Sequence, residues 1–175
     1  MALRGALLLL KKPVGWFHGG APWGNTRAHG KKVLPGPGNL IPAGDDRTFD
    51  TSTGNWLATD PNRGTMSWDN IQQGLRLTND GTTGFCRATL SIQVEAGKTY
   101  TFATEVLEGA FQCGLAWSTT ASGDPNFDST LFAGLGPQSG QITPTQANIF
   151  LMVFINTGTN DSRTVVFDNM SLTEG

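Results

Sequence analysis

Hydrophobic and polar residues alternate with period two through the middle of the chain. Between residues 86 and 94 every second residue is apolar, and the residues between them are Arg87, Thr89, Ser91 and Gln93. Such alternation predicts one long β-strand with a buried face and a polar face.

The segment from residue 149 to 155 departs from this alternation because it is apolar on both parities. Phe150, Met152 and Phe154 alternate with Leu151 and Val153. A strand with this pattern is expected to be covered on both of its faces.

Short segments separated by turn residues complete the pattern. Asn79-Asp80-Gly81 and Glu95-Ala96-Gly97-Lys98 mark two of the turns, and a polar loop is expected over residues 118–129. Eight or more short strands with Gly-rich turns and no helical pattern predict an all-β fold, a two-sheet β-sandwich of the jelly-roll type preceded by an extended N-terminal arm. The remaining strands are expected at residues 65–68, 74–78, 100–106, 111–117 and 164–172.

Composition and charge divide the 175 residues into two parts. With 23 Gly, 9 Pro and only 15% charged residues, the chain is unsuited to a helical bundle or coiled coil. Residues 1–38 carry six Lys and Arg and no acid, whereas residues 39–175 carry six against all 14 acids, a net charge of −8. We therefore expect a basic, Gly/Pro-rich arm over 1–38 and an acidic domain over 39–175.

The arm contains only a short apolar run, residues 6–10, ahead of two lysines. This run is too short for the core of a secretion signal or for a membrane span. The sequence therefore predicts a protein made in the cytoplasm, without signal-peptide secretion and without membrane insertion.

The arm combines positive charge with apolar side chains, which suits docking on an acidic protein surface. The alternative is that its aromatic residues pack back on the chain's own domain. Nucleic-acid binding is disfavoured because the charges are spread thinly among Gly and Pro. The predicted anchoring residues are Leu8, Lys11, Lys12, Trp16, Phe17, Trp23, Lys31 and Lys32.

Several motifs of the acidic domain resemble a known superfamily. Asn39-Leu40-Ile41-Pro42, Phe49-Asp50 and Gly54-Asn55-Trp56 resemble the opening of the jelly-roll carbohydrate-binding modules, of the galactose-binding-like superfamily. Residues 90–100 resemble a strand, the Gly-Lys-Thr-Tyr turn and the next strand of that family, and residues 165–172 resemble its closing strand. The residues Asp45-Asp46-Arg47 look like an insertion ahead of Phe49.

The resemblance implies two functions of different classes. Similar domains occur in head and tail proteins of bacteriophages, and a basic arm on a jelly roll favours that use. We therefore expect a virion accessory protein, present in several copies or as a homo-oligomer and anchored through the arm. A capsid surface is the favoured anchoring site, and a tail is the second choice. The alternative is a carbohydrate-binding module that recognises a glycan on a host surface or a polysaccharide.

Catalysis is not expected from the residue types present. Two carboxylates for glycoside hydrolysis could come from any strands, but the 14 acids are interpreted as surface groups. Both histidines, His18 and His29, lie in the arm, which is a poor scaffold for nucleophilic catalysis. Cys86 and Cys113 fall on inward parities and are interpreted as buried thiols rather than a disulfide.

The same resemblance implies a structural calcium ion, with Asp50 and Asp168 as candidate ligands. Two carboxylates fall short of the ligands that calcium takes, so backbone carbonyls and water would supply the others. The alternative for Asp168 is a carboxylate that caps a turn.

Sugar binding requires an exposed aromatic ring with polar neighbours. The candidates are Trp68, Asp69 and Asn70, together with Phe127 in the expected polar loop. Trp56 and Trp117 fit core positions better, and packing under a loop is the alternative for each candidate ring.

Overall fold

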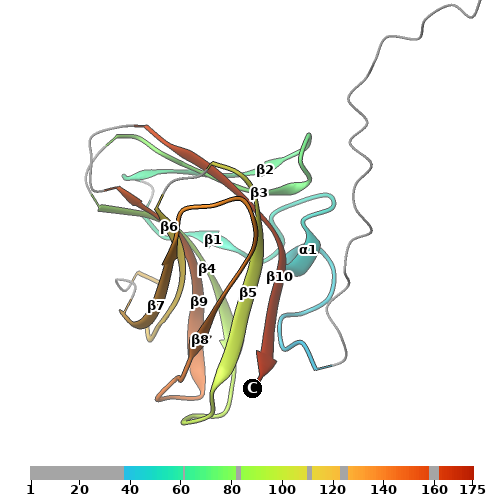
Figure 1. Cartoon of the computed structure of the whole chain (residues 1–175), viewed down its shortest axis with the longest axis vertical. Helices are drawn as coiled ribbons and strands as arrows, with labels where there is room; N and C mark the ends of the chain where they lie inside the picture. Colours follow the sequence, from blue (N-terminus) through green and yellow to red (C-terminus); the bar gives the residue numbers. More distant parts are fainter. Residues whose placement is uncertain (1–37, 61, 82–83, 110–111, 123–125, 158–161) are drawn as a thin grey trace, which may run out of the picture. The chain divides into compact units, whose positions relative to one another are not determined.

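The computed structural model describes residues 38–60, 62–81, 84–109, 112–122, 126–157 and 162–175. The chain divides into two units, residues 1–32 and 33–175, and all described residues belong to the second unit. This unit is a sandwich of two antiparallel five-stranded sheets, as the sequence predicts (Figure 1).

Each sheet contains strands that are far apart in the chain. Sheet A has the strand order β1-β4-β9-β6-β7, and sheet B has the order β2-β3-β10-β5-β8. The elements are α1 (Asp45–Thr48), β1 (Leu57–Ala58), β2 (Gly64–Asp69), β3 (Gly74–Asn79), β4 (Gly84–Gln93), β5 (Tyr100–Glu108), β6 (Cys113–Ser118), β7 (Asn126–Phe132), β8 (Gly136–Ile142), β9 (Asn148–Thr157) and β10 (Thr164–Glu174).

The inner faces of the two sheets form the main core. On β4 the apolar parity points inward, and Cys86, Ala88, Leu90 and Ile92 are all buried. Trp56 and Trp117 are also buried, at 1% and 3% exposure. The period-two pattern and the two expected core tryptophans are therefore confirmed.

A second, smaller apolar cluster lies on the outer face of sheet A. It contains Ala116, Met152 and Phe154, with Phe85 packed against them. The rings of Phe85 and Phe154 meet edge to face, with centroids 5.3 Å apart. Strand β9 is thus covered on both faces over residues 151–155, as its sequence predicts.

Asn39 fastens the start of the described domain to its last strand. Its Oδ1 accepts the N–H groups of Ile41 (3.0 Å) and Leu172 (2.9 Å), and its Nδ2 donates to the carbonyl of Met170. The guanidinium of Arg47 donates to the carbonyl of Asn39. The opening Asn-Leu pair therefore has a structural role.

Three elements differ from the sequence-based expectation. Asp45-Asp46-Arg47, which looks like an insertion, forms most of the short helix α1 beside β10 (Figure 1). The expected polar loop contains the start of β7, and β8 was not predicted. Both strands lie at sheet edges, and neither NFDSTLF of β7 nor the Gly-containing GPQSGQI of β8 has the apolar alternation that identifies a strand.

Candidate functional site

The outer face of sheet A carries an aromatic ring among polar groups at one end of its central strand. Phe150 of β9 is directly opposite Ser91 of β4 on one side and Ser118 of β6 on the other. Gln93 of β4 is opposite Asn148, which precedes Phe150 by two residues on the same face. We call Phe150, Ser91, Gln93 and Asn148 the Phe150 platform.

The platform is accessible where the rest of this face is covered. Ser91, Gln93 and Asn148 are exposed and Phe150 is partly exposed, whereas Met152 and Phe154 on the same face of β9 are buried. The polar parity of β4 places its side chains along one side of this ring, since residues two apart on a strand share a face. The arrangement offers an apolar ring face with hydroxyl and amide groups beside it.

Thr89 lies on β4 next to the platform, and its hydroxyl has unused hydrogen-bonding capacity. The residue is 1% exposed, and its Oγ1 has no hydrogen-bond partner among the described residues. A buried hydroxyl without a partner is unfavourable, so a water molecule or a ligand hydroxyl at this point would stabilise it.

The loop after β6 is held over the same face. The guanidinium of Arg87, which is 8% exposed, donates from Nη2 to the carbonyl of Ser122 at 2.9 Å. Ser118 is buried, and its Oγ accepts the N–H of Thr120. These contacts bound the platform on the side of β6.

Trp68, the first sugar-binding candidate of the sequence, lies at the edge of sheet B. It is opposite Leu75 of β3, on the core side of the sheet, and 37% of it is exposed. Its Nε1 donates to the carbonyl of Phe49 at 2.7 Å. The ring therefore helps to close the edge of the core, and its role in sugar binding stays a prediction.

Asp69 is already engaged by its own chain. Its carboxylate accepts the N–H groups of Ile71 (2.8 Å) and Gln72 (3.0 Å) and pairs with Arg76, whose guanidinium also contacts Glu108. Burial disfavours its charged form, but the N–H of Gln72, the Arg76 guanidinium and the N–H of Ile71 outweigh this, so the Asp69 pKa is below its ordinary value.

The other predicted site residues fall in different places. Asn70 is exposed beside Asp69 at the turn between β2 and β3, and Phe127 belongs to β7, although its side chain lies outside the described residues. All the predicted anchoring residues of the arm also lie outside the described residues.

The candidate calcium ligands differ in their surroundings. Asp50 is exposed and accepts a hydrogen bond from the hydroxyl of Thr48 at 2.7 Å, whereas Asp168 is 4% exposed on β10. Within the described ranges no group of three or more His, Cys, Asp and Glu residues lies together as a metal site. A calcium ion held by Asp50 and Asp168 stays a prediction.

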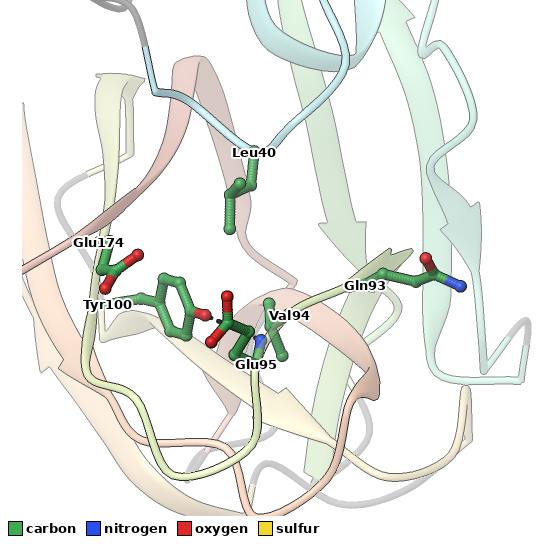
Figure 2. Close-up of a pocket in the computed structure, with 6 residues that line it drawn as sticks. All are labelled: Leu40, Gln93, Val94, Glu95, Tyr100 and Glu174. Carbon is green, nitrogen blue, oxygen red and sulfur yellow. Dashed lines mark hydrogen bonds between the residues drawn. The ribbon is translucent and has the colours of Figure 1, made fainter.

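A separate pocket of about 290 Å³ opens at the end of the sandwich where β4 turns into β5. Figure 2 shows Leu40 on one side of this pocket and Tyr100, Glu95 and Glu174 on the other, with the Gln93 side chain turned away from them. The lining residues are Leu40, Gln93, Val94, Glu95, Tyr100 and Glu174.

The Phe150 platform was not found from the sequence. Phe150 belongs to a run that is apolar on both parities, so nothing in the sequence distinguishes it from its buried neighbours. The alternating polar residues of β4 were the available signal, but only the strand register shows which of them flank an aromatic ring.

No family model matches the chain, and no curated protein matches it. Solved structures do share its fold. A module described as "CBM4 structure and function" has 14% sequence identity and a TM-score of 0.57, covering 73% of this chain and 100% of its own.

Two further solved structures cover similar shares of this chain and of their own chains. The second N-terminal cellulose-binding domain of Cellulomonas fimi β-1,4-glucanase C has 13% identity and a TM-score of 0.52, covering 80% of this chain and 97% of its own. TmCBM61, solved with β-1,4-galactotriose, has 15% identity and a TM-score of 0.50, covering 78% of this chain and 99% of its own. The chain therefore has the fold of a jelly-roll carbohydrate-binding module. Within the described residues no helix is long and apolar enough to span a membrane.

Proposed function

We propose that the domain is a non-catalytic carbohydrate-binding module and that it binds a glycan chain on the outer face of sheet A. The observation that carries this proposal is the Phe150 platform, which places a partly exposed ring between polar side chains of two neighbouring strands. A pyranose has apolar C–H faces and a rim of hydroxyl groups, so it needs both kinds of surface side by side.

The geometry of the strands fits a chain rather than a single sugar. Side chains on one face of a strand recur every two residues, about 6.6 Å apart. The exposed side chains of Ser91 and Gln93 therefore offer hydrogen-bonding groups about 6.6 Å apart along β4. These groups follow the line of an extended ligand that begins on Phe150.

The outer face of sheet B is a poorer candidate. Arg76 of β3 lies on this face and forms ion pairs with Asp69 and Glu108, and Gln72 donates to the same Glu108 at 2.8 Å. The described residues that point outward from this sheet include no aromatic ring. The polar groups around Arg76 are thus already paired with one another.

The comparisons support the choice of ligand class. TmCBM61 was solved with β-1,4-galactotriose, and the Cellulomonas fimi domain is described as cellulose-binding. We therefore propose a linear β-linked polysaccharide as the ligand of this chain.

The test measures binding of the full chain to a panel of soluble β-linked polysaccharides, before and after substitution of the platform. Phe150→Ala should weaken binding at least about tenfold, because it removes the apolar contact for a sugar ring. Ile71→Ala is the matched control, since Ile71 is an apolar residue 83% exposed on the β2–β3 hairpin. Its binding should equal that of the unaltered chain.

Two results would count against the platform. Unchanged binding by Phe150→Ala, with loss of binding by Trp68→Ala, would move the site to the edge of sheet B. Absence of binding to every polysaccharide of the panel would remove the proposed function.

We also propose that this module works on a bacteriophage particle, anchored by its basic arm. The support is the charge asymmetry, since residues 1–38 contain no acid and residues 39–175 have a net charge of −8. On a particle, the module would meet host-surface glycans. Binding of the full chain to purified particles should weaken with added salt and should fail without residues 1–38. Equal binding by the shortened chain would contradict the anchoring role.

A further inference from the structure

The pocket between Leu40 and Tyr100 has a negatively charged rim. Glu95 and Glu174 both line it, and no basic residue does. Lys98 bridges the two carboxylates, with its Nζ 3.0 Å from Oε2 of Glu95 and 2.9 Å from Oε1 of Glu174. The other oxygen of each carboxylate has no partner among the described residues, so each can accept a further hydrogen bond.

The pKa of Lys98 indicates that this pair of carboxylates favours a positively charged group. Hydrogen bonds to Glu174 and Glu95 raise the pKa of the Lys98 ammonium above its ordinary value. With Lys98 in place, Glu95 and Glu174 still leave a net charge of −1 at the rim, which would attract the ammonium group of a ligand.

Tyr100 provides a second and independent polar group. Tyr100 is 2% exposed, and its hydroxyl oxygen accepts the N–H of Glu95 at 2.8 Å (Figure 2). The hydroxyl proton has no acceptor among the described residues. A buried hydroxyl normally both accepts and donates, so an acceptor oxygen in the pocket would complete its hydrogen bonding.

The remaining walls of the pocket are apolar. Leu40, which is 40% exposed, faces Tyr100 across the hollow, and Val94 lines the pocket next to Glu95 (Figure 2). A volume of about 290 Å³ lies at the lower end of the range for pockets that bind small organic molecules. The space suits a ligand of one ring with an apolar face.

We propose that this pocket binds a single sugar residue that carries a free amino group. Its ammonium would contact Glu95 and Glu174, and one of its oxygens would accept the Tyr100 hydroxyl. The C–H face of its ring would lie against Leu40 and Val94. The pocket borders the Phe150 platform at Gln93, whose side chain is turned away from the other lining residues (Figure 2), and the proposal does not depend on the proposed function.

The test is an NMR titration of the isotopically labelled full chain with glucosamine, N-acetylglucosamine and glucose at constant pH and ionic strength. Glucosamine should shift the amide signals of Val94, Glu95 and Tyr100 in a saturable manner. The two sugars without a charged amine should bind about fivefold more weakly, the size expected for a solvent-exposed ion pair.

Substitutions test the roles of the polar groups. Glu174→Gln and Tyr100→Phe should each weaken glucosamine binding about three- to fivefold. Glu105→Gln makes the same charge change on the outer face of sheet B, where Glu105 accepts a hydrogen bond from Asn169, and should leave binding unchanged. Because the Tyr100 hydroxyl also accepts the N–H of Glu95, the stability of Tyr100→Phe is compared with that of the unaltered chain by thermal unfolding. If Tyr100→Phe is unfolded, the result for Glu174→Gln decides the test.

Several outcomes would overturn the proposal. They are equal affinity for glucosamine and glucose, shifts confined to other parts of the domain, absence of saturable shifts, or methylammonium binding as tightly as glucosamine. Phe150→Ala should leave glucosamine binding intact. A failure at this pocket is therefore distinguishable from a failure of polysaccharide binding at the platform.

Discussion

At the scale of single residues, Asp69 links the stability of the domain to pH. Its pKa lies below the ordinary value of 3.8, so the folded state binds the carboxylate's proton more weakly than the unfolded state does. The stabilisation is fully present above about pH 4 and is lost as the pH falls through the lowered folded-state pKa.

We predict that Asp69→Asn lowers the free energy of unfolding at pH 7 by about 1 to 3 kcal/mol, because buried hydrogen bonds to a charged group are lost. The deficit should shrink as the pH falls below 4, where the unaltered carboxyl becomes protonated. Denaturant unfolding at pH 7 and pH 3 measures both values. A deficit that is equal at the two pH values would contradict the assignment.

The two cysteines lie in one row of sheet A but too far apart for a disulfide. Both are opposite Ile155, with Cys86 on one side and Cys113 on the other. Two strand spacings separate their Cα atoms by about 9.6 Å, beyond the roughly 7 Å that a disulfide allows. Both are free and buried thiols.

We predict that both thiols resist alkylation at pH 8 in the native protein. Burial, with smaller effects of Asp80 and Asp60, raises the pKa of Cys86 to about 11, and burial raises that of Cys113 to about 12. The thiolate that reacts is therefore scarce. Both should react fully after denaturation without reductant, as mass spectrometry would show. Rapid reaction of the native protein would contradict this burial.

At the scale of elements, the strands were predictable in proportion to their apolar alternation. The long strand β4 and the doubly covered strand β9 follow from their patterns, whereas β8, with the sequence GPQSGQI, has almost no apolar residue to mark it. Helix α1 is a single turn whose place depends on hydrogen bonds of Arg47 with Asn39 and of Asp46 with Asn55, in the segments on either side of it. Such contacts cannot be inferred from local sequence.

Gly114 of β6 shows how one residue sets the packing on the outer face of sheet A. A Cβ at this position would lie 2.5 Å from Cζ of Phe154 and 2.7 Å from the carbonyl oxygen of Thr130. Because Gly114 has no side chain, there is room above it for the Phe154 ring, which meets Phe85 edge to face.

We predict that Gly114→Ala destabilises the domain by about 1 to 3 kcal/mol, the usual result of overpacking. Gly134→Ala is the control, because the nearest atom to its added Cβ would be 3.6 Å away. Chemical denaturation of both variants gives the comparison. An equally stable Gly114→Ala variant would show that the outer cluster can shift to accept a methyl group.

At the scale of the whole molecule, the Asn39 side chain holds the start of the described domain against its last strand. Asn39 bonds to the backbone of Ile41, Met170 and Leu172, and the N–H of Leu40 donates to the carbonyl of Leu172 at 2.8 Å. The start of the described domain is therefore hydrogen-bonded to the C-terminal half of β10, the middle strand of sheet B.

We predict that a chain beginning at Asn39 unfolds at the same temperature as the full chain, whereas one beginning at Ile41 is less stable by about 1 to 3 kcal/mol. The first cut removes only the basic segment, and the second removes the Asn39 contacts. Differential scanning calorimetry of the three chains measures the effect. A large loss of stability in the chain beginning at Asn39 would show that residues 1–38 contribute to the fold.

The candidate site was less predictable than the fold. The resemblance correctly indicated the jelly-roll fold of carbohydrate-binding modules, but Trp68 and Asp69, chosen for their adjacency in sequence, are hydrogen-bonded to Phe49 and Arg76 in the folded domain. The platform unites Phe150 with Ser91, which is far away in the chain, and this proximity exists only through strand pairing.

The most direct test of glycan binding at the Phe150 platform is to map a bound polysaccharide by NMR. The labelled full chain would be titrated with the polysaccharide of the panel that binds best, and shifted amide signals would be assigned. We predict the largest shifts at Ser91, Gln93, Asn148 and Phe150, with the outer face of sheet B unchanged. Shifts centred on Arg76 and Glu108 instead, with the platform unchanged, would contradict the account.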